Sequence, residues 1–349
     1  MKRFVFAVPG DLKTPTGGYA YDRRMIAELT ALGWEIEVAD IGNEFSRPSE
    51  RAKDAARARL LAVPAGTPIV VDGLAFGVLP ELAADLHVEH PLIALVHHPL
   101  ALESGIPTAE AEDFHRRERA ALAHTDGVIV TSPSTARLLA RDYGVEAEDI
   151  TVVLPGSEPR TAERGHRDGP VALLAVGAVV RRKGYDVLVE ALASLRDLPW
   201  RLTIAGDRTR SPAAVTALDA DIARHALADR IDLAGAVDDA RLAALYADAD
   251  LFVLPSRFEG YGMAFAEAIA HGLPVIGTTA GAIPDTVPEG AGILVPPDDA
   301  AALARALRRL ITDGGERGRL AAAARDAAAR LPTWRQSAQE FARAIEAVR

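Results

Sequence analysis

Short apolar segments alternate with helical patterns along almost the whole chain, and this alternation limits the fold more than any other feature. In the first half, apolar segments of strand length lie at residues 4–8, 35–41, 69–72, 92–97, 127–131 and 151–154. Between them, apolar residues recur at helical spacing at residues 19–32, 80–86, 110–123 and 134–143. Strands that are apolar on both faces are typical of a parallel sheet covered by helices on both sides. The pattern therefore predicts an α/β, doubly wound fold.

The alternation stops once and then begins again. Residues 155–170 are rich in Pro, Gly and charged side chains, which is typical of a linker. Further strands are predicted at 171–176, 201–205, 231–234, 251–254, 274–277 and 292–295, with helices at 186–195, 212–226, 240–247 and 263–271. Helical patterns at 300–311, 317–330 and 334–348 complete the chain. We therefore predict two Rossmann-like parallel-sheet domains, residues 1–160 and 161–332, that face a cleft, followed by a helical segment at 333–349.

The composition limits both the class of protein and the class of partner. A chain of 349 residues with 49% hydrophobic and 25% charged residues has the balance of a soluble globular protein. Its net charge of −10 gives no electrostatic attraction to nucleic acid or to an anionic membrane. No segment approaches the roughly 20 apolar residues of a membrane span, and the first apolar run ends too early, at Pro9, for a signal peptide. With no cysteine there is no disulfide and no thiolate metal site, so we expect a cytoplasmic protein.

Two acidic residues, Glu259 and Glu267, stand on either side of a Gly-Tyr-Gly turn between a predicted strand and a predicted helix. A helix that begins after such a turn presents free N–H groups and the positive end of its dipole, which suits a phosphate. Carboxylates beside that anion accept hydrogen bonds from hydroxyls. A helix-start acid followed by a solvated surface charge is the alternative interpretation. The position between a strand end and a helix start favours a site for a sugar nucleotide.

A basic turn lies between the strand predicted at 171–176 and the helix predicted at 186–195. Arg181, Arg182 and Lys183 are consecutive there, and three cations at a helix N-terminus repel its dipole. A bound polyanion would relieve that repulsion, whereas an exposed basic turn is the alternative. Only four lysines occur among the 39 lysine and arginine residues. This scarcity favours a functional role for Lys183 over a generic surface charge.

The segments around these residues resemble glycosyltransferase family 4, whose members are retaining transferases with the GT-B fold. The resemblance lies in residues 255–262 and 267–275 and continues in 281–285 and 291–295. It implies that Glu267 binds the ribose hydroxyls of a donor nucleotide and that Glu259 lies beside the transferred sugar. The donor-binding residues predicted on this basis are Arg182, Lys183, Val237, Gly260, Tyr261, Gly262, Met263 and Glu267.

The sequence departs from the family pattern at two positions. The family usually has an arginine directly after the glycine that corresponds to Gly177, where this chain has Ala178. We expect Arg182 or Arg181 to supply the missing charge. The second departure is Asp285, where the family usually has glutamate.

Features of the first domain give weaker signals. The glycines Gly17 and Gly18 let the backbone approach a ligand closely, and the resemblance implies that they face the donor or the acceptor. His97 and His98 end a predicted strand, and such a pair can bind metal, transfer protons or cap the strand. No neighbouring residue completes a metal set, so we predict no metal. The resemblance implies that His97 meets the donor sugar, and that the helix of Trp334 packs back on the first domain.

These observations together predict a retaining, metal-independent hexosyltransferase that moves a sugar from a nucleoside-diphosphate sugar to an unidentified acceptor. The predicted catalytic residues are Glu259, Lys183 and His97, and no cofactor is expected. Two Asp-x-Asp pairs, at 219–221 and 248–250, fall in or beside helical patterns and are interpreted as structural. The alternatives are a sugar-nucleotide epimerase and a non-catalytic sugar-nucleotide-binding protein. The absence of a clear basic amphipathic helix argues against strong docking on a membrane.

Overall fold

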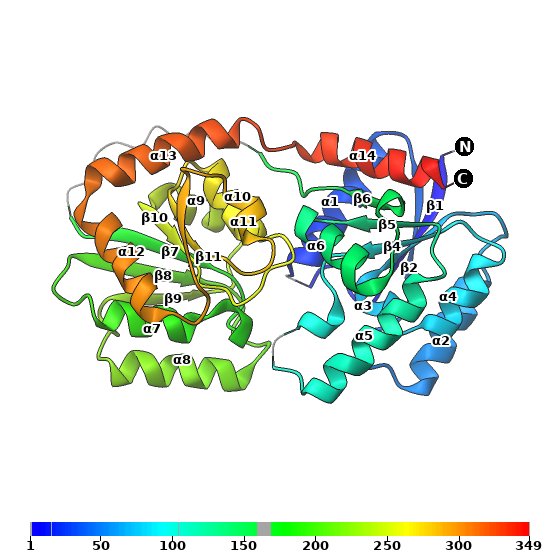
Figure 1. Cartoon of the computed structure of the whole chain (residues 1–349), viewed down its shortest axis with the longest axis horizontal. Coiled ribbons are helices and arrows are strands. Elements are labelled where there is room, and N and C mark those ends of the chain that lie inside the picture. The colour runs from blue at the N-terminus through cyan, green and yellow to red at the C-terminus, as the bar shows by residue number, and fades with distance from the viewer. Residues whose placement is uncertain (1, 15, 104, 159–168, 349) are drawn as a thin grey trace. The chain divides into compact units, whose positions relative to one another are not determined.

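The chain forms two compact units, each with its own parallel sheet (Figure 1). The computed structural model describes residues 2–14, 16–103, 105–158 and 169–348. Unit 1 comprises Met1–Gly156 and Pro332–Arg349, and unit 2 comprises Ser157–Leu331. The predicted α/β fold with two doubly wound sheets is confirmed. The predicted boundary between residues 160 and 161 lies outside the described residues, as does most of the predicted linker.

All strand pairs of unit 1 are parallel, and the strand order is β2-β1-β3-β4-β5-β6. The strands are β1 (Arg3–Val8), β2 (Glu35–Asp40), β3 (Ile69–Asp72), β4 (Leu92–Val96), β5 (Gly127–Val130) and β6 (Ile150–Val152). Because β1 pairs with both β2 and β3, the order reverses between β1 and β3. Doubly wound sheets bind ligands outside the carboxyl ends of the strands at such a reversal.

Seven α-helices accompany this sheet in the described part of unit 1. They are α1 (Gly17–Ala31), α2 (Glu50–Leu61), α3 (Gly73–Phe76), α4 (Pro80–His87), α5 (Thr108–Leu122), α6 (Pro133–Leu138) and α14 (Trp334–Ala347). Short 3-10 turns lie at Leu100–Leu102 and Ala147–Asp149, and a π-helical turn at Leu139–Tyr143 extends α6. The polar helix α2 was not among the predicted helices, and only Ala56 and Leu60 of its residues are buried.

The last helix, α14, packs against α1 within unit 1 (Figure 1). The Trp334 ring lies 6.0 Å from the Tyr21 ring, and the Phe341 ring lies 6.4 Å from the rings of Phe4 and Phe6. These aromatic side chains join the end of the sequence to strand β1 and helix α1 at its start. Pairs of aromatic rings at such distances contribute about 0.5–1.5 kcal/mol beyond the area that they bury.

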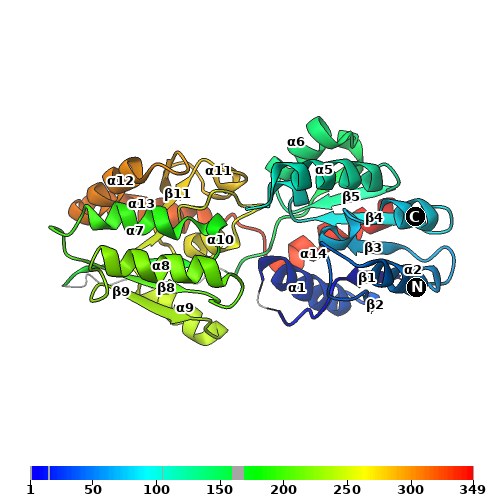
Figure 2. The same ribbon diagram turned by 90° about the horizontal axis from the view of Figure 1, so that it is seen from below.

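Unit 2 repeats the same architecture with the strand order β12-β11-β10-β7-β8-β9. The strands are β7 (Val171–Val176), β8 (Trp200–Ala205), β9 (Ile231–Gly235), β10 (Leu251–Val253), β11 (Val275–Thr278) and β12 (Gly292–Val295). The helices are α7 (Tyr185–Ala193), α8 (Pro212–Arg224), α9 (Asp239–Asp248), α10 (Met263–Ala270), α11 (Ile283–Thr286), α12 (Ala300–Thr312) and α13 (Gly314–Ala328). The order reverses between β7 and β10, which are paired neighbours. Helices α7 and α8 lie side by side (Figure 2).

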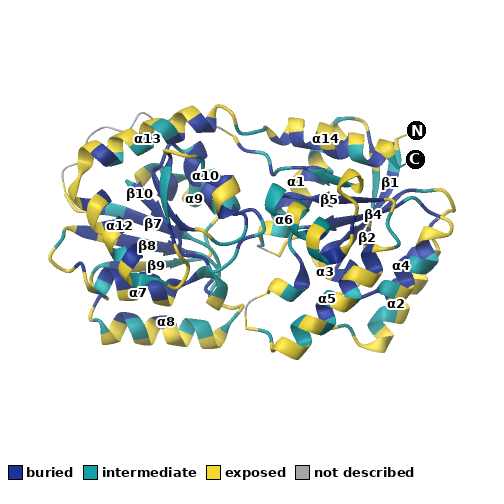
Figure 3. Cartoon of the chain, in the orientation of Figure 1, coloured by how far each residue is buried: buried dark blue, intermediate teal, exposed yellow. Residues whose placement is uncertain are grey.

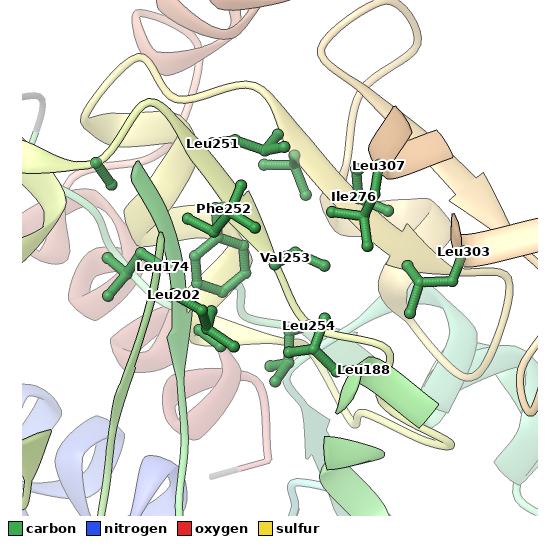
Figure 4. Packing of buried hydrophobic residues seen from close by; sticks show 14 of the residues in the cluster. Leu174, Leu188, Leu202, Leu251, Phe252, Val253, Leu254, Ile276, Leu303 and Leu307 are labelled. Atoms are coloured by element: carbon green, nitrogen blue, oxygen red, sulfur yellow. The ribbon is translucent and has the colours of Figure 1, made fainter. Parts of the chain in front are cut away.

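The core of unit 2 explains why its strands are so continuously apolar. Leu174, Leu202 and Phe252 from adjacent strands are buried against Leu188 of α7 and Leu303 of α12 (Figure 4). Burial is concentrated on the strands and on the inner faces of the helices, while exposed residues lie outside (Figure 3). Each such side chain contributes roughly 1.5–3 kcal/mol when fully buried. Among the described residues, no helix combines the length and the apolar character that crossing a membrane requires.

Candidate functional site

The neighbouring strands β7 and β10 bring two distant loops together in unit 2. The loop after β7 contains a 3-10 turn, Arg181–Lys183, and the loop after β10 contains Glu259. The carboxyl ends of parallel neighbours meet at the same edge of a sheet, so these loops meet although 76 residues separate Lys183 from Glu259. The strand reversal therefore assembles the acidic and basic features that the sequence presents separately.

Glu259 forms a buried charged cluster with two cations. Its Oε1 accepts hydrogen bonds from Lys183 Nζ at 2.7 Å and from Ser256 Oγ at 2.6 Å. Its Oε2 accepts a hydrogen bond from Arg182 Nη1 at 2.9 Å. Glu259 is only 6% exposed, and a carboxylate that deep in a protein needs such partners to remain charged. We call Arg182, Lys183 and Glu259 the ion cluster.

The electrostatics of the ion cluster favour a bound anion. Burial alone would raise the pKa of Glu259, but the charges of Lys183 and Arg182 hold it at about 2, so this group is a carboxylate at neutral pH. Burial lowers the pKa of Lys183, and Arg182 and Arg210 add to that lowering, while Glu259 opposes it. Two cations share one carboxylate, so the three side chains carry a net positive charge. An additional anion would stabilise the charged form of Lys183.

Glycines allow the two loops to approach as closely as they do. Gly184 has a φ of +69°, and a Cβ at that position would lie 2.1 Å from the Pro255 carbonyl oxygen. Gly177 has a φ of +154°, and its Cβ would lie 2.8 Å from Lys183 Cε. A side chain at either glycine would push the β7 loop away from its neighbours.

Arg257 ties the two loops together from the outside. Its guanidinium donates to both carboxylate oxygens of Asp186, at 3.0 and 2.7 Å, and to the Arg181 carbonyl at 2.6 Å. The backbone N–H of Arg257 also donates to the Arg182 carbonyl at 2.8 Å. A bidentate arginine–carboxylate pair fixes geometry as well as charge. Arg257 therefore holds the basic turn against the loop that carries Glu259.

Helix α10 begins beside the ion cluster and is left uncapped by side chains. Its N-cap is Gly262, with a φ of +94°, and no side-chain cap bond is made there by the described residues. The backbone of Glu259 is held in place because Ala282 N donates to its carbonyl oxygen at 2.9 Å. The first N–H groups of α10 are thus available to an anion next to the net positive charge of the cluster.

Glu267 lies one turn into α10, and its carboxylate is oriented by a tyrosine that the sequence analysis missed. Tyr246 of α9 donates from its hydroxyl to Glu267 Oε2 at 2.8 Å. The Tyr246 ring stacks on His271, with centroids 4.9 Å apart and an angle of 16° between the planes. Burial raises the pKa of Glu267, and the Tyr246 hydrogen bond opposes that rise. Nothing in the local sequence distinguishes Tyr246 from an ordinary core aromatic on α9.

The remaining predicted donor residues of unit 2 are placed as follows. Gly260, Tyr261, Gly262 and Met263 continue the chain from Glu259 into α10. Val237 follows β9 and packs in part against the core. Of the two alternative arginines, Arg182 contacts Glu259, whereas the side chain of Arg181 is exposed. The direct pairing of Lys183 with Glu259 was not expected, because the two residues were assigned to different parts of the donor.

His97 of unit 1 lies at the end of β4 beside two buried carboxylates. Its Nε2 is 3.2 Å from Asp22 Oδ1 and 3.6 Å from Asp72 Oδ2. The expectation that no neighbouring residue completes a metal set with His97 was therefore wrong, because α1 and the end of β3 each supply a carboxylate close to it. The absence of a metal stays a prediction.

Gly18 has a structural reason to be glycine, because a Cβ there would lie 3.2 Å from His97 Cδ2. Gly17 is the exposed first residue of α1.

The Asp-x-Asp pairs have structural partners. Asp219 and Asp221 of α8 pair with Arg208 and Arg224, each at 2.6 Å. In the second pair, the aspartate at position 250 accepts a hydrogen bond from the backbone of β7.

Two family descriptions match most of the chain. Residues 170–313 match "Glycosyl transferases group 1", and residues 74–161 match "Glycosyltransferase Family 4". The D-inositol 3-phosphate glycosyltransferase of Xylanimonas cellulosilytica is 35% identical over 238 aligned residues, and the match covers 63% of this chain and 57% of that protein. The chain spans about three fifths of the length of the curated relatives that it matches.

Solved structures with similar folds cover the whole chain. The sucrose-phosphate synthase of Thermosynechococcus elongatus superposes with a TM-score of 0.83 and 24% identity over 98% of each chain. HepE of Anabaena, solved with UDP and glucose, superposes with a TM-score of 0.78 and 19% identity over 99% of each chain. At these identities the likeness shows the fold, which is the GT-B fold that the resemblance implied.

Proposed function

This chain belongs to glycosyltransferase family 4, and from that premise we propose that it transfers a sugar from a nucleoside-diphosphate sugar to an acceptor. The observation that carries the proposal is the ion cluster next to the uncapped start of α10. As the bond between sugar and diphosphate breaks, negative charge grows on the leaving group. Fixed cations and helix N–H groups stabilise such charge without reorganising, which is usually the largest contribution to catalysis.

Each residue of the ion cluster has a proposed role in that reaction. Lys183 and Arg182 hold the diphosphate together with the first N–H groups of α10. Glu259 keeps both cations in position before the donor binds, and its carboxylate faces the positive charge that develops on the sugar. Because the protein's own cations supply the charge stabilisation, the reaction is proposed to be metal-independent. Retention of anomeric configuration is proposed from the resemblance to the family. Glu267, oriented by Tyr246, accepts hydrogen bonds from the ribose hydroxyls.

The acceptor is not assigned by these observations. His97 in unit 1 is proposed to contact the transferred sugar, and the loop at Gly17 and Gly18 to face the donor or acceptor. The contacts that support the proposal, those of the ion cluster and of Glu267, all concern the donor. We therefore restrict the proposal to the donor class, a nucleoside-diphosphate hexose.

A thermal-shift panel of UDP-, GDP- and ADP-sugars tests the proposal. A ligand at 100 times its dissociation constant adds about 2.7 kcal/mol to the free energy of unfolding, so one nucleotide class should raise the melting temperature well above the others. The shift should be lost in Lys183→Ala and kept in Arg208→Ala, which removes a cation whose partner lies on α8. No shift with any member of the panel would contradict the proposal.

Turnover with the donor so identified separates transfer from the alternatives. Transfer of the sugar to an acceptor with formation of a new glycosidic bond, in the presence of EDTA, is the expected result. Conversion of the donor into an epimer without acceptor would instead indicate an epimerase. Loss of activity in EDTA that manganese restores would contradict metal independence.

A further inference from the structure

A second buried charged cluster lies in unit 1, and we call Asp22, Asp72 and His97 the histidine cluster. The two carboxylates come from α1 and from the end of β3, and His97 follows β4. The side chains of Asp22 and Asp72 are 0% and 3% exposed, whereas that of His97 is 20% exposed. Both carboxylates approach the same ring nitrogen, Nε2, at 3.2 and 3.6 Å. The Nε2 group therefore hydrogen-bonds Asp22 and lies within ion-pair distance of Asp72.

The imidazole ring is held on its other sides as well. The Tyr21 ring meets it edge-on, with centroids 5.3 Å apart and planes at 82°. Gly18 packs beside the ring, since a Cβ at that position would lie 3.2 Å from His97 Cδ2. The Thr131 hydroxyl donates to the His97 carbonyl at 3.4 Å. The carboxylates lie at Nε2, so Nδ1 is the ring nitrogen that they do not use.

The charges of the histidine cluster favour a protonated ring. Asp72 also accepts the backbone N–H of Leu74 at 2.7 Å as the N-cap of α3, while Asp22 Oδ2 has no hydrogen-bond partner among the described residues. Burial opposes a charge on His97, but the charges of Asp22 and Asp72 outweigh it and raise the His97 pKa to about 10. Burial, with the charge of Asp72, raises the pKa of Asp22 to about 7. Tyr21 is the other titratable group against the ring, and burial keeps it neutral by raising its pKa.

We propose that Asp22 and Asp72 are positioning residues that hold His97 as an imidazolium, so that its Nδ1–H donates a hydrogen bond to an oxygen of the substrate. The assignment rests on the proposed function for the identity of that substrate. It excludes a role for His97 as a general base at neutral pH, because an imidazolium has no lone pair to accept a proton. It also gives the two buried aspartates a reason to lie beside the same ring nitrogen.

Histidine-selective NMR of the full-length protein tests the proposal without any need for activity. The His97 resonances, assigned by their loss in His97→Gln, should stay those of an imidazolium at pH 8. In Asp22→Asn, which preserves side-chain shape, the His97 pKa should fall by at least about one unit, as expected when one of two carboxylates near a cation is removed. The matched control is Glu103→Gln, which removes the carboxylate 3.4 Å from His98 Nε2 and should leave His97 unchanged.

Kinetics with the identified donor provide the second measurement. Asp22→Asn should lose activity relative to the wild type as pH rises from 6 to 9 and recover it at pH 6, where His97 is protonated in both proteins. A purely structural defect would lower activity at every pH. If Asp22→Asn does not fold, Asp72→Asn replaces it in the same titration.

Three results would overturn the proposal. One is a wild-type His97 that titrates near its ordinary pKa of about 6.5, and another is a His97 pKa unmoved in both variants. The third is stoichiometric metal in the purified protein that Asp22→Asn removes. Because the titration is read without turnover, an inactive protein with a protonated His97 would refute the proposed function while confirming that the two aspartates hold His97 as an imidazolium.

Discussion

Glu259 combines two tasks that the sequence suggests for different residues. It is the counter-ion that lets Arg182 and Lys183 lie in a largely buried loop, and it is the carboxylate that we propose to face the donor sugar. Two cations and one anion are stable together out of water only while all three are present. An unpaired buried charge costs more free energy than a charge pair contributes.

We expect Glu259→Gln to destabilise unit 2 by about 3–5 kcal/mol, because it leaves two cations without their shared anion. Chemical denaturation of both proteins measures this difference. The control is Asp219→Asn, which removes the exposed partner of Arg208 and should cost less than about 1 kcal/mol. Equal stability of Glu259→Gln and the wild type would show that the ion cluster does not contribute to folding. A nucleoside diphosphate should restore part of the loss by supplying a new anion.

The residues that sequence alone identified are those in local motifs. Glu259, Glu267 and Lys183 stand in recognisable segments, so the sequence could single them out as candidate site residues. The choice between Arg181 and Arg182 required the direction of each side chain on a one-turn helix. Asp22 and Asp72 lie 75 and 25 residues before His97, on separate elements, and only the strand order places them around one ring.

At the scale of elements, strands and long amphipathic helices followed from the sequence, whereas polar helices and loop contacts did not. The strands are covered on both faces, so their apolar runs identify them. Helix α2 presents only two buried residues and has no comparable pattern. The loops that form the ion cluster depend on glycines whose φ values and close contacts cannot be read from their positions in the sequence.

Gly184→Ala tests the close approach of the two loops. The new Cβ would lie 2.1 Å from the Pro255 carbonyl oxygen at a φ of +69°, so we expect a loss of at least about 2 kcal/mol from strain and displacement. Gly235→Ala is the matched control, because its φ is +68° and no atom lies within 4 Å of the new Cβ. That control should cost only about 1 kcal/mol, the strain of the left-handed conformation. Equal losses in the two variants would mean that the loops can separate freely.

At the scale of the whole molecule, the chain is two parallel-sheet units, and Glu118 and His97 of unit 1 respond to pH in the opposite direction from Glu259 of unit 2. The duplication could be predicted because the strand–helix alternation occurs twice. The return of the last helix to unit 1 has no signal in periodicity and rests on contacts such as Trp334 with Tyr21. The opposite responses to pH depend on burial, which the sequence does not show.

We expect alkaline pH to weaken unit 1 and acid pH to weaken unit 2. In unit 1, burial raises the pKa of Glu118 from 4.5 to about 8, and the neighbouring aspartates raise the pKa of His97 from 6.5 to about 10 despite burial. A group whose pKa is higher in the folded than in the unfolded chain stabilises the fold at low pH. The contribution of Glu118 is lost as pH rises through about 8, and that of His97 as pH rises through about 10. In unit 2 the pKa of Glu259 is lowered from 4.5 to about 2, so its contribution is present above pH 4.5 and lost as pH falls towards 2.

Hydrogen exchange followed by mass spectrometry resolves the two responses within one chain. Amides of β3 and β4 should lose protection at alkaline pH before those of β7 and β10, after correction for the intrinsic exchange rate. The order should be reversed in acid. Loss of protection in both units at the same pH, at either extreme, would contradict the assignment of these charges.

The most direct single measurement is the turnover number of Lys183→Ala with saturating donor and acceptor, in a variant shown to be folded by its far-UV circular dichroism. Loss of a preorganised cation at the leaving diphosphate should lower kcat by about 10²-fold or more. Lys183→Arg, which keeps the charge, should retain more activity than Lys183→Ala. A folded Lys183→Ala protein that turns over at nearly the wild-type rate would remove the ion cluster from the mechanism.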